Sequence, residues 1–92
     1  MNIFEIYQKK IKDLILLMKK NGLILAPENL NSINVDIPPA QFDSDISTNV
    51  AMVLSKINKI NPLDLAKKIE KDLKENDPNI SKIDIVKPGF IN

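Results

Sequence analysis

The apolar residues of the first quarter of the chain recur every three or four positions, and lysines fill much of the space between them. This spacing predicts an amphipathic helix from about Asn2 to Asn21, with Gly22 as a left-handed cap beyond it. A lysine-rich amphipathic helix can also lie on a membrane surface, but acidic interruptions and the folded domain that follows disfavour that alternative. The predicted apolar stripe consists of Phe4, Tyr7, Ile11, Leu14, Ile15 and Met18.

Strand patterns occupy the middle and the end of the chain. Residues 33–37 alternate strictly between apolar and polar, which predicts a half-buried strand that the two following prolines end. Residues 80–86 predict a second strand, Pro88-Gly89 a sharp turn, and Phe90 the start of a last strand. The apolar residues 23–25, within a polar connector, are a candidate for a further short strand.

Two more helices are predicted between these strands. The first spans Asp45 to Lys59, with an inward stripe of Val50, Val53, Leu54 and Ile57 and cap candidates at Asp45, Ser47 and Thr48. The second begins with Asn61 as N-cap and Pro62 at the first helical position. Its apolar stripe is Leu65, Ala66, Ile69 and Leu73, and the mixed charges around it favour a solvated face.

The order of predicted elements is helix, strand, helix, helix, strand, strand. It indicates an α+β fold, with three main helices packed on a small, mostly antiparallel β-sheet. Ninety-two residues suit a single domain, residues 1–92. Because the sequence ends within a predicted strand, we expect it to be a fragment of a longer protein.

Composition excludes several kinds of chemistry. The chain has neither cysteine nor histidine, so a thiolate nucleophile, a cysteine zinc site and a Ser-His-Asp triad within it are ruled out. With two glycines, neither a Walker loop nor a dinucleotide fingerprint can be written. Asp43 and Asp45 are paired carboxylates, but their place before a predicted helix favours capping over a metal or acid–base role. We therefore expect no catalytic residues and no metal site.

The last residues offer candidate binding chemistry. Phe90 and Asn92 are two apart on a predicted strand, so they share one face, while Ile91 points to the other. An aromatic ring stacks on a base and an amide reads a base edge, as in recognition of single-stranded RNA. A hydrophobic strand that simply closes the sheet is the alternative. The net charge of +1 excludes a polycation that grips phosphates indiscriminately, and all thirteen basic residues are lysine.

Three segments together resemble the N-terminal domain of arginyl-tRNA synthetases. They are Asp45-Ile46-Ser47-Thr48-Asn49-Val50-Ala51-Met52, Asn61-Pro62 at a helix start, and Lys87-Pro88-Gly89-Phe90-Ile91-Asn92. The first resembles that family's Gly-Asp-aromatic-Ala-Thr-Asn-x-Ala pattern, and the last its Gly-Pro-Gly-Phe-Ile-Asn strand. Ser44, Ile46 and Lys87 depart from these patterns.

The resemblance implies a domain that binds tRNA-Arg at its elbow and reads a D-loop nucleotide. Phe90 would stack on the base and Asn92 would bind its edge, with Gly89 and Lys87 beside them. ATP and arginine would bind to the remainder of the synthetase, an arginine–tRNA ligase, so we expect no cofactor and no enzymatic activity in these residues alone.

Other readings stay open. Lys56 and Lys82 are further candidates for contact with the RNA backbone. There are two alternatives to RNA binding. The domain could be a structural appendage, which would bury the Phe90 ring, or a protein-interaction module that binds by strand addition at an exposed sheet edge. No apolar run reaches membrane-spanning length and no signal peptide is evident, so we expect a cytoplasmic protein with neither membrane nor DNA as a partner.

Overall fold

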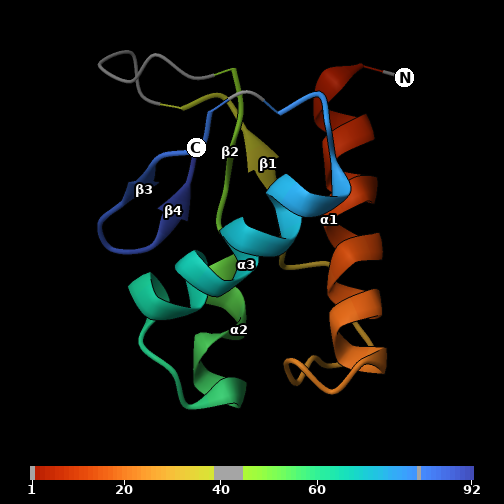
Figure 1. The fold of residues 1–92 in the computed structure, drawn as a ribbon. Helices are drawn as coiled ribbons and strands as arrows, with labels where there is room; N and C mark the ends of the chain where they lie inside the picture. The colour runs from red at the N-terminus through yellow and green to blue at the C-terminus, as the bar shows by residue number, and fades with distance from the viewer. Residues whose placement is uncertain (1, 39–44, 81) are drawn as a thin grey trace.

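A computed structural model describes residues 2–38, 45–80 and 82–92. The described residues form three helices and a four-stranded antiparallel sheet in the order β1-β2-β4-β3 (Figure 1). The predicted α+β class, with helices on a small antiparallel sheet, is therefore confirmed. The elements are α1 (Ile3–Lys20), β1 (Val35–Asp36), β2 (Ser47–Thr48), α2 (Val50–Asn58), α3 (Pro62–Asn76), β3 (Ile85–Val86) and β4 (Phe90–Ile91).

The first helix begins and ends close to where the sequence predicts, and the third begins where the sequence predicts. The Asn2 side chain accepts a hydrogen bond from the backbone N–H of Glu5 at 2.9 Å and caps α1. Gly22, just beyond α1, has a φ of 74°. At the start of α3 the Asn61 side chain accepts from the N–H of Leu63, also at 2.9 Å, and Pro62 occupies the first helical turn.

Three predicted boundaries were wrong. Residues 45–59 do not form one helix, because Ser47 and Thr48 form strand β2 and the helix begins at Val50. Residues 23–25 are not a strand, since Leu25 exchanges backbone hydrogen bonds with the side chain of Asn58 instead of with a sheet. The two outer strands, β1 and β3, are each only two residues long.

The core is shared by every layer of the fold. Helix α1 packs against β1 and α3, whereas α2 and α3 contact β4 and each other (Figure 1). Burying these apolar faces against one another supplies most of the stability of so small a domain. The largest side chains that are less than 2% exposed are Ile11, Ile15, Met18, Ile33, Val50, Leu54, Leu65 and Ile69.

A polar cluster fastens α1 to the end of α3. Lys10 Nζ lies 3.2 Å from Asp77 Oδ2 and 5.0 Å from the centre of the Tyr7 ring. Burial disfavours the charged form of Asp77, but hydrogen bonds from the Asn79 backbone, Lys10 and Tyr7 outweigh it and hold the pKa of Asp77 below its ordinary value of 3.8. Burial, together with Asp77, raises the pKa of Tyr7. The cluster therefore requires an ionised Asp77.

This cluster predicts a pH-dependent contribution to stability. A carboxylate whose pKa is lowered by folding stabilises the native state above its unfolded pKa, and this contribution is lost as the pH falls below about 3.8. Asp77→Asn should lower the free energy of unfolding by about 1–2 kcal/mol at pH 7. The difference from the parent chain should shrink between pH 4 and pH 2 in urea titrations. A difference that stays constant over this range would contradict the role of the ionised carboxylate.

Candidate nucleic-acid interface

Strand β4 holds the candidate base-reading residues in place. It pairs with β2 on one side, where Thr48 faces Ile91, and with β3 on the other, where Val86 faces Phe90. Ile91 is 4% exposed in the core, whereas Phe90 is 38% exposed. The alternation predicted for the last strand is therefore confirmed, and the Phe90 ring is not fully covered.

The register of the four strands defines the face of the sheet on which Phe90 lies. Thr48 and Ile85 are each paired with Ile91, and all three face the core, so their neighbours along each strand face the other way. We call this second surface the outer face. Its residues are Asp36, Ser47, Asp84, Val86, Phe90 and Asn92.

Asn92 is held on both its backbone and its side chain. Its backbone N–H donates to the carbonyl of Asp84 at 2.8 Å, and its own carbonyl accepts from the N–H of Asp84 at 3.0 Å. On the side of β2, the hydroxyl of Ser47 donates to Asn92 Oδ1 at 2.7 Å. The sequence placed Ser47 near a helix start, so this contact was not predicted.

The turn before β4 explains the glycine beside the candidate pair. Gly89 donates its N–H to the carbonyl of Val86 at 2.9 Å, and its φ is 155°. A Cβ at this position would lie 2.7 Å from the Cβ of Pro62 and 3.2 Å from Met52. The structure thus places Gly89 against the start of α3, where it fixes the angle at which the hairpin meets the helices, and leaves no room for a side chain.

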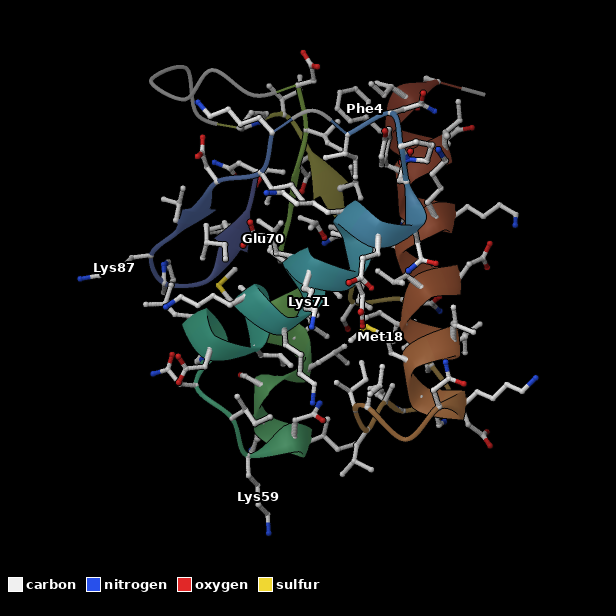
Figure 2. The ribbon with its side chains drawn as sticks, in the orientation of Figure 1. Phe4, Met18, Lys59, Glu70, Lys71 and Lys87 are labelled. Carbon is white, nitrogen blue, oxygen red and sulfur yellow. The ribbon has the colours of Figure 1, made fainter. Side chains whose placement is uncertain are left out.

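The candidate lysines are dispersed. Lys87 is exposed on the hairpin turn, and Figure 2 shows its side chain extending away from the body of the domain. Lys82 forms an ion pair with Asp84 at 3.7 Å, next to Asn92. Lys56 lies in the last turn of α2, a helix that leads away from the sheet (Figure 1). Lys87 and Lys82 therefore flank the outer face, and Lys56 does not.

A pocket of about 180 Å³ opens at the end of the sheet. It lies between the start of α1 and the segment that leads into β3, and its lining includes Asp45, Asn92, Ile11 and Ile91. Asp43, which the sequence paired with Asp45, lies outside the described residues. Among residues 2–38, 45–80 and 82–92, no group of three or more acidic side chains is placed to hold a metal ion.

In the part of the chain that the structure describes, no helix is long and apolar enough to cross a membrane.

The fold defines the class of protein: a small α+β domain that presents an aromatic ring and a fixed amide on the outer face of its sheet. The comparisons give the particular family. The family model described as arginyl tRNA synthetase N terminal domain matches residues 5–92. The chain belongs to this family, which confirms the resemblance noted in its motifs.

The relatives of the chain are arginine–tRNA ligases. That of Pelagibacter ubique is 54% identical over 92 residues, and that of Bartonella quintana is 46% identical over 92. The enzyme of Staphylococcus carnosus is 40% identical over 93 residues. Each alignment covers 100% of this chain but 16% of the relative. The chain thus spans about one sixth of the length of these enzymes. No solved structure matches it.

The close approach of Gly89 to α3 predicts a steep cost for adding a side chain there. Gly89→Ala should lower the free energy of unfolding by about 2–4 kcal/mol, from the clash with Pro62 and the positive φ together. Gly22→Ala is the matched control, because Gly22 has a positive φ but no atom within 4 Å of an added Cβ. It should cost about 1–2 kcal/mol. Equal losses for the two variants in chemical denaturation would contradict the packing role of Gly89.

Proposed function

We propose that this domain binds tRNA-Arg at the elbow of the tRNA and reads a D-loop nucleotide on the outer face of its sheet. The observation that carries the proposal is the pairing of an exposed Phe90 ring with the fixed amide of Asn92 on one face of β4. Stacking on the ring would supply about 1–3 kcal/mol and the amide would supply the choice of base. Membership of the family supports this role, since its relatives bear the name arginine–tRNA ligase.

The remainder of the parent enzyme supplies the other parts of this function. The relatives are about six times as long as this chain, so ATP, arginine and most of the tRNA would bind outside these residues. In the parent enzyme the domain would support ATP-dependent arginylation of tRNA-Arg. The near-neutral charge of the domain fits a contribution to selectivity more than to affinity.

The two alternatives explain the outer face less well. A purely structural appendage gives no reason for Phe90 to stay 38% exposed beside a polar neighbour. Strand addition at β4 is also disfavoured, because β4 is an interior strand that pairs with β2 and β3. A partner strand would have to pair with β1 or β3, each of which offers an edge of only two residues.

Replacement of the ring tests the proposal directly. Phe90→Ala should weaken binding of a tRNA-Arg transcript about tenfold or more, because the stacking contact is lost. The substitution should also remove the preference of the domain for the tRNA-Arg transcript over one in which the D-loop nucleotide is replaced. Fluorescence anisotropy with both transcripts measures the two effects.

The matched control for this test is Leu16→Ala, which removes an exposed apolar side chain from α1, a helix on the opposite side of the domain from the β3–β4 hairpin. It should leave affinity and base preference unchanged. Retention of both properties by Phe90→Ala, with its fold intact by circular dichroism, would rule out the proposed stacking.

The exposed lysine on the hairpin predicts a different kind of effect. Lys87→Gln should weaken binding to both transcripts equally, because a phosphate contact carries no sequence information. The slope of log affinity against log salt concentration should fall in magnitude by about 1. Lys59→Gln, which changes the exposed lysine at the far end of α2 (Figure 2), should leave the slope unaltered. An unchanged slope in Lys87→Gln would place Lys87 outside the interface.

A further inference from the structure

Ser47 lies beside Asn92 on the neighbouring strand and is almost fully covered. Its side chain is on the outer face, yet the residue is only 7% exposed. Its hydroxyl donates to Asn92 Oδ1 at 2.7 Å, the usual distance for an O–H···O hydrogen bond. Because β2 pairs with both β1 and β4, the backbone of Ser47 is fixed by strands on either side.

The same contact restricts the orientation of the Asn92 amide. Two backbone hydrogen bonds to Asp84 fix the main chain of Asn92, so its remaining freedom is rotation of the side chain. The hydroxyl of Ser47 removes that freedom by holding Oδ1 against β2. Since the oxygen and the nitrogen of an amide diverge from one carbon, the NH₂ group then points away from β2.

Asn92 is partly exposed and lines the pocket at the end of the sheet. Within the described part of the chain its NH₂ group donates to no protein group, and no buried side-chain polar atom there lacks a partner. Asn92 lies on the outer face together with Phe90. In the same row of the sheet, Asp84, which precedes β3, lies opposite Asn92, and Asp36 on β1 lies beyond Ser47.

We propose that Ser47 is a positioning residue that orients the Asn92 amide so that it donates to an acceptor on the edge of the D-loop base. The acceptor is a carbonyl oxygen or an unprotonated ring nitrogen, and an exocyclic amine at that position is rejected because it faces another donor. This inference rests on the proposed function and adds to it the direction of the hydrogen bond and the residue that sets it.

Four variants test this orientation. Ser47→Ala should lower the affinity for tRNA-Arg about threefold to tenfold and reduce the ratio of affinities for the matched and replaced transcripts toward one. Ser47→Thr keeps the hydroxyl and should restore both. Asn92→Asp keeps an acceptor for Ser47 but has no NH₂ group, so it should lose the preference as completely as Asn92→Ala does.

The preference between transcripts is the informative quantity, because a merely structural defect would lower both affinities alike. Urea unfolding of each variant checks that it is folded. If Ser47→Ala does not fold, Asn92→Asp still tests the donor, since Asn92 is at the surface end of β4.

The outcomes separate this inference from the proposed function. If the unaltered domain binds the matched and the replaced transcripts equally well, base reading is refuted and the inference with it. If the unaltered domain prefers the matched transcript and Ser47→Ala keeps this preference, only the role of Ser47 is overturned. A preference retained by Asn92→Asp would overturn the assignment of Asn92 as a donor.

Discussion

The burial of Ile91 between two partner strands is the constraint on which the candidate interface depends. This side chain is 4% exposed and anchors β4 to the core that α2 and α3 cover. Because side chains alternate along a strand, burying Ile91 forces Phe90 and Asn92 onto the opposite face. A slip of one residue in register would exchange the two faces. Gly89 secures the same register from the other side, since its contact with Pro62 fixes where the hairpin meets α3.

The sequence predicted the features that depend on local chemistry. Asn61 is a cap because its side chain accepts a hydrogen bond from the free N–H of Leu63, a contact between residues two apart. Alternation also placed Phe90 and Ile91 on opposite faces of the last strand, whereas the exposure of the Phe90 ring was left open until the structure showed it. Strand β2 was missed because Ser47 and Thr48 are followed at once by a helical pattern, and two residues carry no detectable period. Its existence depends on pairing with Ile91, which lies far along the chain.

The distribution of charge fits the proposal that this domain contributes selectivity and the remainder of the synthetase contributes affinity. The outer face has two carboxylates, and Lys82 is engaged with one of them. Such a face attracts the phosphate backbone weakly, so the proposed recognition would depend on stacking and on one oriented amide. In this account the domain distinguishes one nucleotide while the longer remainder of the synthetase supplies affinity. Ser47 belongs to this account because an amide free to rotate would offer donor and acceptor alike and distinguish bases poorly.

The most direct test of the central claim is to observe the Phe90 ring in the complex by NMR. With a selectively labelled phenylalanine, the account predicts upfield shifts of the Phe90 ring protons on addition of tRNA-Arg and nuclear Overhauser effects from them to protons of one D-loop base. The ring of Phe4, on α1, provides an internal reference. If the domain is saturated with tRNA-Arg and the Phe90 ring signals do not change, the proposed stacking of Phe90 on a base is contradicted.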